Sequence, residues 1–289
     1  MGNAPLKHAL TVDVEDYFQV SAFAKVVGRE DWKDFPSHVA DNTRKVLQIL
    51  ERDGVKATFF VLGWVAEHHP EVVPMIAAAG HEIACHGYSH TRIMKQDRKI
   101  FREETRRAKA ILEDQAGHAV HGYRAASFSI VGDTLWALDE LAEAGFAYDS
   151  SIFPVTHDLY GIADSPTNPY TITTPDGHRL AEFPITVLPI AGYHLPVAGG
   201  GYFRLFPYWF TRWALGRVAG SGRNAVFYMH PWEVDTHQPR IHGAGLLSRF
   251  RHYNNLNKVE ARLGRLLSDF SFTTCHEVLA GHGLLDGTC

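Results

Sequence analysis

Short apolar segments alternate with amphipathic helical patterns along most of the chain, and this alternation limits the possible folds more than any other feature. Ala57–Leu62 (ATFFVL) is typical of a buried strand and lies between helical patterns at Val39–Arg52 and Glu71–Ala79. Gly80 follows the second of these helices, at a position where glycine commonly ends a helix. Strand–helix repeats with short connections predict a parallel sheet, and we expect a (β/α) barrel.

The same pattern continues to about residue 149 and resumes after residue 206. The further predicted strands are Ala9–Val14, Glu82–Cys85, Val120–Arg124, Phe146–Asp149, Asn224–Met229 and Phe270–Thr274, and the further predicted helices run from Asp97 to Gly117 and over Asp133–Ala144, Pro207–Val218 and Asn254–Asp269. Ser151–Phe206 is rich in proline, glycine and threonine and predicts loops with a β-hairpin. A connection of this length suggests a functional surface, and we expect it to decorate a single domain spanning residues 1–289.

Composition excludes several classes of protein. Hydrophobic residues make up 45% of the chain and charged residues 21%, as in a globular protein with a sizeable core. The formal charge of −4, without a basic stripe, argues against nucleic acid as a partner. No apolar run reaches the roughly 18 residues that cross a bilayer, and residues 1–7 lack the pattern of a signal peptide. Because three cysteines make no disulfide framework, we expect a cytoplasmic protein.

Titratable side chains follow several of the predicted strands. Asp13, Glu15 and Asp16 crowd the end of the first strand. Other strands lead into His86 and His90, Arg124, Asp149 and His230. Because all carboxyl ends of the strands in a parallel barrel open on one face, these side chains are expected to meet there.

His86 and His90 lie four residues apart in HGYSH, and a carboxylate from another strand would complete a three-ligand metal site. Asp13 and Glu15 alternate in phase, so that one could hold the metal while the other handles protons. Hydrolysis at a metal also needs an acid for the leaving group, and His230 is the candidate.

These pieces, in this order, resemble the polysaccharide deacetylase family with the NodB homology domain (carbohydrate esterase family 4). The resemblance implies a distorted (β/α) barrel, often of seven strands, and metal-dependent removal of acetyl groups from sugars. The family's first motif, Thr-Phe-Asp-Asp-Gly, corresponds to TVDVED here and implies that Asp13 is the catalytic base. Glu15 is the preferred metal carboxylate, because it shares a strand face with Asp13, and Asp16 is the alternative.

The second motif, His-x-x-x-His, implies that His86 and His90 are metal ligands, and zinc or another divalent metal is the expected cofactor. The third motif, Arg-x-Pro, is matched by Arg124, which would fix the base, although residue 126 is alanine.

The fourth motif is matched loosely by YDSSIF, which implies that Asp149 lies near the acetyl pocket. The fifth, Leu-x-His, appears as YMH and implies that His230 is the catalytic acid and that Met229 lies close to the pocket. Further substrate contacts are expected from Tyr202 and Arg204, in AGGGYFRL, and from Trp232.

The expected substrate is an N-acetylated sugar in a polysaccharide or its lipid-linked precursor, with peripheral contact to the lipid-linked form. AGGGYFRL and a C-terminal extension at about 236–289, after a core at about 8–235, resemble a subgroup associated with exosortase (PEP-CTERM) and exopolysaccharide gene clusters. An allantoinase-like hydrolase of a small cyclic amide and a catalytically silent sugar-binding barrel are the alternatives. The sequence leaves the oligomeric state open.

Overall fold

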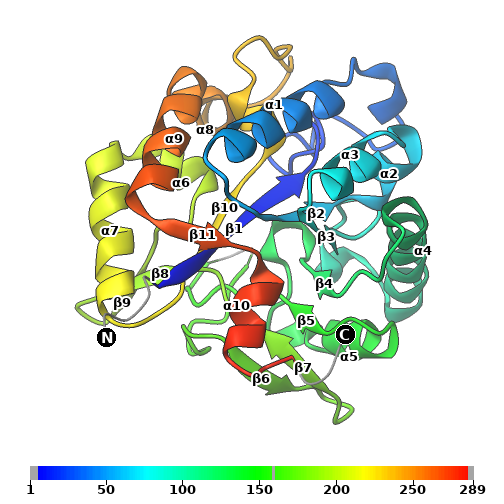
Figure 1. The fold of residues 1–289 in the computed structure, drawn as a ribbon. Helices are drawn as coiled ribbons and strands as arrows, with labels where there is room; N and C mark the ends of the chain where they lie inside the picture. Colours follow the sequence, from blue (N-terminus) through cyan, green and yellow to red (C-terminus); the bar gives the residue numbers. More distant parts are fainter. Residues whose placement is uncertain (1–5, 158–159, 286–289) are drawn as a thin grey trace.

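The computed structural model describes residues 6–157 and 160–285 (Figure 1). Nine of the described strands form one sheet in the order β10-β1-β2-β3-β4-β5-β7-β6, with β11 beside β1. They are β1 (Lys7–Val14), β2 (Thr58–Val61), β3 (Glu82–Cys85), β4 (Gly122–Tyr123), β5 (Tyr148–Asp149), β6 (Tyr170–Thr173), β7 (Arg179–Glu182), β10 (Val226–Met229) and β11 (Ser271–Thr273). All pairs are parallel except β6 with β7.

Helices surround the strands, and Figure 1 shows α1, α4, α7 and α9 around their outer side. The described helices are α1 (Val39–Arg52), α2 (Gly63–His68), α3 (Val72–Ala78), α4 (Arg98–Ala116), α5 (Trp136–Glu143), α6 (Gly200–Leu205), α7 (Tyr208–Gly220), α8 (Leu246–Tyr253), α9 (Val259–Asp269) and α10 (Cys275–Gly281). Among the described residues, none of the helices combines the length and the apolar character that crossing a membrane requires.

The predicted α/β fold with a mostly parallel sheet is confirmed. Seven strands, β10, β1, β2, β3, β4, β5 and β7, follow one another in parallel. Hydrogen bonds among the described strands do not join β7 to β10, and loop segments lie in that position instead. The backbone N–H of Val226 donates to Oγ1 of Thr186 (2.7 Å), and that of Tyr228 donates to the carbonyl oxygen of Ala198 (2.7 Å).

Both faces of the strands are apolar, which explains the nearly continuous hydrophobic runs in the sequence. In β2, Phe59 packs into the large cluster between the sheet and the outer helices, whereas Phe60 packs into a second cluster within the barrel. Cys275 and Leu279 of α10 belong to the inner cluster, so this helix closes the interior at the amino ends of the strands. Polar side chains therefore gather at the opposite end of the barrel, where the strands have their carboxyl ends.

Several elements differ from the prediction. Ser151–Phe206 holds two hairpins rather than one, β6–β7 and a separate pair, β8 (Val187–Ile190) with β9 (Tyr193–Pro196). The strand predicted at Val120–Arg124 pairs only over two residues, and α2, α6, α8 and α10 were not predicted. These helices have six to eight residues, which is too short for a clear 3.6-residue period. The division into a core and a C-terminal extension stays a prediction.

Candidate active site

A cavity of about 540 Å³ opens where β1, β3 and β10 end. This is the face of the barrel on which the sequence analysis placed the titratable groups. The expected site residues that line the cavity are Asp13, Glu15, His86, His90, Tyr202, Arg204, His230 and Trp232.

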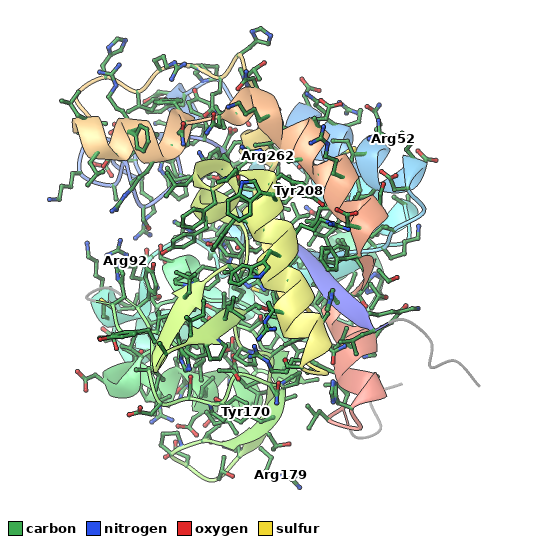
Figure 2. The ribbon with its side chains drawn as sticks, turned by 90° about the vertical axis from the view of Figure 1, so that its left-hand side faces the viewer. Arg52, Arg92, Tyr170, Arg179, Tyr208 and Arg262 are labelled. Atoms are coloured by element: carbon green, nitrogen blue, oxygen red, sulfur yellow. The ribbon has the colours of Figure 1, made fainter. Side chains whose placement is uncertain are left out.

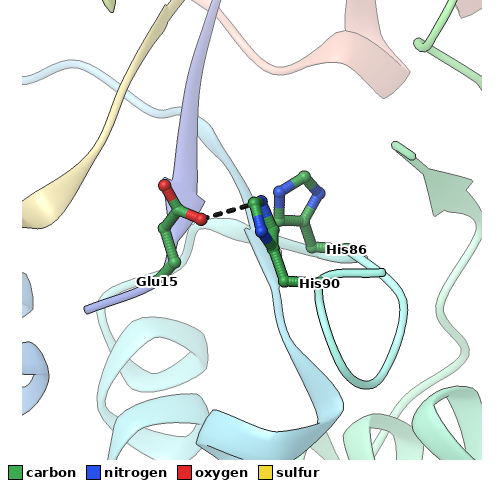
Figure 3. A group of neighbouring side chains, drawn as sticks. All are labelled: Glu15, His86 and His90. Carbon is green, nitrogen blue, oxygen red and sulfur yellow. Dashed lines mark ion pairs between the residues drawn. The ribbon is translucent and has the colours of Figure 1, made fainter. Parts of the chain in front are cut away.

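Glu15, His86 and His90 form the tightest group in this cavity (Figure 3). One ligand atom from each lies within 4.8 Å of the others, and Nε2 of His90 lies 2.9 Å from Oε2 of Glu15. Nδ1 of His86 lies 2.8 Å from the carbonyl oxygen of Arg124, which fixes the ring and leaves Nε2 for a ligand. A carboxylate and two imidazoles on one side of an open cavity form a donor set that suits zinc and similar divalent ions.

The electrostatics of the group also fit a metal ion. Oε2 of Glu15 is buried, and Nε2 of His90 is its one close polar partner among the described residues, so the carboxylate could accept a further partner such as a cation. Burial would raise the pKa of Glu15, but the charge of His90 and its hydrogen bond, together with the charge of His230, lower the pKa to about 2, so the carboxylate is ionised. Burial lowers the pKa of His86 to about 4, which keeps the ring neutral, as a metal ligand must be.

Asp16, the alternative ligand, is not brought to this group. Its Oδ2 accepts hydrogen bonds from Oγ of Ser37 (2.6 Å) and from the backbone N–H groups of His38 (2.9 Å) and Val39 (3.2 Å). The carboxylate therefore satisfies the first turn of α1, where an anion is favourable. The geometry favours Glu15 over Asp16.

Arg124 binds Asp13 inside the protein. Nη1 of Arg124 donates to Oδ1 of Asp13 and to Oγ1 of Thr11, both at 2.7 Å. Nη2 donates to Oγ of Ser150 at 3.0 Å, and the guanidinium lies 4.0 Å from the ring centroid of Phe60. These contacts fix the orientation of the Asp13 carboxylate at the cavity wall.

His230 is held by Glu233, a residue that the sequence analysis missed. Nδ1 of His230 lies 2.6 Å from Oε1 of Glu233, and its Nε2 lies 3.5 Å from Oε1 of Glu15. Burial would lower the pKa of His230, but the hydrogen bond with Glu233 and the charges of Glu15 and Glu233 raise it above its ordinary value. The spacing of histidine and glutamate in HPWE was the available signal, because three residues bring the two side chains together in the 3₁₀ turn Pro231–Val234.

Trp232 forms the centre of a stack of rings beside Glu15, a member of the candidate metal site. Its ring lies 5.1 Å from that of His230 and 4.1 Å from that of His252, at interplanar angles of 20° and 16°. Nε1 of Trp232 donates to Oε1 of Glu15 at 3.4 Å. Trp232 therefore positions Glu15 as well as lining the cavity.

Arg204 also lines the cavity, but its guanidinium binds protein groups. Nε donates to Oε2 of Glu233 at 2.9 Å, and Nη1 donates to the carbonyl oxygens of Arg251 and His252. Arg204 thus connects α6 to the turn that carries His230. Its expected contact with substrate stays a prediction.

Two expected substrate residues lie away from the cavity. Asp149 is fully buried, and its carboxylate accepts hydrogen bonds from the side chain (2.6 Å) and backbone (3.1 Å) of Ser151. Met229 is buried in the large cluster between sheet and helices. The resemblance of YDSSIF and YMH to family motifs implied that these residues lie near the pocket, but both side chains are buried away from the cavity.

Two family models match successive parts of the chain. Residues 32–147 match the family model described as polysaccharide deacetylase, and residues 150–280 match a domain of unknown function, DUF3473. A relative from Bacillus cereus, named peptidoglycan-N-acetylglucosamine deacetylase, is 30% identical over 148 residues. The match covers 47% of this chain and 52% of the relative, so the chain spans about half the length of that protein.

Two solved structures share the fold. One is an inferred polysaccharide deacetylase from Mycobacterium smegmatis, with a TM-score of 0.61 and 24% identity over 96% of this chain and 94% of that one. The other is Puue allantoinase, with a TM-score of 0.62 and 16% identity over 97% of this chain and 91% of that one. The two are almost equally similar in shape, so fold alone does not choose between sugar and ureide as substrate.

Proposed function

We propose that this chain is a metal-dependent N-deacetylase of carbohydrate. The match to the polysaccharide deacetylase model and the named relative support this proposal. The substrate is an N-acetylated sugar in a polysaccharide or a lipid-linked oligosaccharide, and exopolysaccharide biosynthesis in the cytoplasm is its setting. The same proposal places the chain in the exosortase-associated subgroup of the family.

One observation carries the proposal: the cavity combines a candidate metal site with a carboxylate and an imidazole that can move protons. Glu15, His86 and His90 supply the ligands, while Asp13 and His230 line the same cavity. Amide hydrolysis needs this combination, because water must lose a proton and the departing nitrogen must gain one.

Glu15, His86 and His90 would hold a divalent ion, which would supply Lewis acidity for water and the acetyl carbonyl. Asp13 accepts the proton of the water whose oxygen attacks the carbonyl carbon, and Arg124 holds the accepting carboxylate in place. His230 donates a proton to the nitrogen as the carbon–nitrogen bond breaks, giving acetate and a free amine. Its raised pKa keeps more of the ring protonated near neutral pH, as an acid requires.

The cavity also suits a sugar. Phe128 and Tyr202 give its wall apolar ring surface, while Ser127 and Asn254 provide hydrogen-bonding groups. N-acetylglucosamine is the sugar in the name of the Bacillus cereus relative, and it is the substrate unit proposed here.

Acetate release from N-acetylglucosamine oligomers by the zinc-loaded protein tests the proposal. Activity should fall by about 10²–10⁴-fold in Asp13→Asn and His230→Asn, because each removes a proton-transfer group. His237→Asn, at an exposed histidine, is the matched control and should keep full activity.

Allantoin provides the competing substrate. Ring opening of allantoin without acetate release from the oligomers would replace this function with that of an allantoinase. Zinc-loaded protein that binds the oligomers and hydrolyses neither substrate would identify a catalytically silent sugar-binding barrel.

A further inference from the structure

Helix α8 (Leu246–Tyr253) turns its apolar side chains towards solvent. Leu246 is 83% exposed, and Leu247 and Phe250 are also exposed, whereas the buried residue of the helix is His252. Residues spaced i, i+1 and i+4 share one face of a helix, so the outward face is the apolar one. The exposed Arg249 and Arg251 flank this face on its two sides.

Helix α7 (Tyr208–Gly220) repeats the arrangement. Its buried residues, among them Ala214 and Val218, face the core, while Trp209 (68% exposed) and Trp213 form the centre of the opposite face. Two exposed arginines flank the tryptophans, Arg212, which also pairs with Asp269 at 3.1 Å, and Arg217. Figure 2 looks onto this side of the molecule, with α7 crossing its centre and α8 at the upper left.

The sequence around these helices contains few carboxylates, so it carries a positive net charge although the whole chain has a formal charge of −4. Residues 183–259 contain two carboxylates, Glu233 and Asp235, and both are paired within the protein, with Arg204 and His38. The same stretch contains a set of cationic residues, Arg204, Arg212, Arg217, Arg223, Arg240, Arg249, Arg251 and Lys258. An anionic partner is the one that this distribution of charge complements.

The apolar surface is continuous with the candidate active site. Leu247, Phe250 and Arg251 of α8 line the cavity, as does Leu205 at the end of α6. A chain of ring contacts leads outwards from Tyr202 in the cavity through Phe206 and Phe210 to Trp213, with centroid distances of 6.3, 4.6 and 5.6 Å. A partner that covers the two helices would therefore reach the cavity mouth.

We propose that the α7–α8 surface, made of Trp209, Trp213, Leu246, Leu247 and Phe250 with Arg212, Arg217, Arg249 and Arg251, docks this protein onto an anionic lipid bilayer. Tryptophan, leucine and phenylalanine side chains enter the boundary between headgroups and acyl chains, while arginines beside them bind lipid phosphates. The exposed aliphatic leucines at the amino end of α8 favour a bilayer over a polysaccharide, because sugars stack on aromatic rings rather than on leucine side chains.

Docking on a bilayer would also favour a lipid-linked substrate, an inference that rests on the proposed deacetylase function. With α7 and α8 on the bilayer, the cavity opens at the membrane surface, next to the headgroup of a lipid carrier. A lipid-linked oligosaccharide would then present its first sugars at the cavity without leaving the membrane.

Co-sedimentation with vesicles tests the docking. The zinc-loaded protein should bind vesicles containing phosphatidylglycerol and phosphatidylcholine, and bind pure phosphatidylcholine much less. Trp209→Gln/Leu246→Gln should weaken binding at least about tenfold, because two apolar anchors are lost. Met94→Gln/Ile100→Gln, at exposed apolar residues outside the surface, is the matched control and should bind as the wild type does. Arg249→Gln should bind more weakly, with a reduced dependence on salt.

Failure of docking and failure of the proposed function are distinguishable, because Trp209→Gln/Leu246→Gln should release acetate from soluble oligomers at the wild-type rate. Acetate release by a wild-type protein that does not bind anionic vesicles would overturn the docking and leave the function intact. Binding that is equal for wild type and Trp209→Gln/Leu246→Gln would also overturn it. A wild-type dimer in sedimentation velocity that this variant dissociates, without vesicle binding, would identify the surface as an interface between two copies.

Discussion

Nη1 of Arg124 lies 2.7 Å from Oδ1 of Asp13, and both side chains are almost completely shielded from solvent. Removing one member of a buried ion pair leaves the other charge without compensation. Arg124→Met should therefore lower the free energy of unfolding by about 3–5 kcal/mol, as measured by urea denaturation. It should also abolish acetate release, because the orientation of Asp13 is lost.

Arg106→Gln is the matched control for this prediction. Arg106 is an exposed arginine that lies 3.8 Å from Glu143, and such pairs contribute at most about 1 kcal/mol. If the free energy of unfolding fell no further in Arg124→Met than in Arg106→Gln, the buried ion pair would not stabilise the protein as described.

Glu233→Gln should lower kcat by about 10–100-fold and leave KM nearly unchanged, because Glu233 orients His230 and maintains its charge without lying in the cavity. Glu233→Asp should recover part of the lost kcat. The nearby Asp235→Asn is the control, since Asp235 binds His38 (2.7 Å) outside the cavity. An unchanged kcat in Glu233→Gln would show that His230 does not depend on this partner.

We expect that position 199 cannot accept a side chain and that position 201 can. The φ of Gly199 is 124°, and a Cβ there would lie 2.0 Å from the carbonyl oxygen of Tyr228, while a Cβ on Gly201 would meet nothing within 4 Å. Gly199→Ala should destabilise the protein by about 2–4 kcal/mol. Gly201→Ala, in α6, should be neutral or stabilising by up to about 1 kcal/mol. Equal urea midpoints for the two variants would contradict this prediction.

Much of the fold could be predicted because the signals are local. The strand at Ala57–Leu62 and the helix between Asp97 and Gly117 carry their own periodicity and caps, and the structure places both within a residue or so of the predicted bounds. Parallel order then follows from the alternation of strands and helices.

The candidate site could be predicted in part. His86 and His90 lie in one short motif, so their proximity needs only a loop after a strand. Asp149 does not line the cavity, because the rotation of a two-residue strand, which decides between cavity and core, depends on its neighbours in the sheet. Helix α8 was missed because its eight residues are too few for a clear helical period. Its apolar residues also face solvent, whereas a sequence pattern of apolar residues is normally interpreted as the core-facing side of a helix.

The stability of the protein should depend on two buried histidines as the pH falls. Nδ1 of His8 accepts the backbone N–H of Ala225 (3.0 Å), and Nδ1 of His81 accepts that of Ala57 (3.1 Å). Burial lowers the pKa of each ring to about 4. Since the unfolded chain titrates near its ordinary pKa of about 6.5, it binds more protons between these values, and stability is lost as the pH falls below about 6.5.

At pH 5 each histidine should cost on the order of 1–2 kcal/mol relative to pH 7.5. His8→Gln and His81→Gln should therefore lose less stability than the wild type between these two pH values, in urea denaturation. His237→Gln, at an exposed histidine, should behave as the wild type does. Parallel losses in all four proteins would contradict the assignment.

The central claim is that Glu15, His86 and His90 hold the metal on which deacetylation depends, and a zinc titration of acetate release tests it most directly. After chelation, wild type and Asp16→Asn should regain activity on N-acetylglucosamine oligomers in proportion to added zinc, up to one equivalent per chain. Glu15→Ala and His90→Ala should stay inactive at that level of zinc. Recovery in Glu15→Ala equal to that of the wild type, or wild-type activity that survives chelation, would contradict the claim.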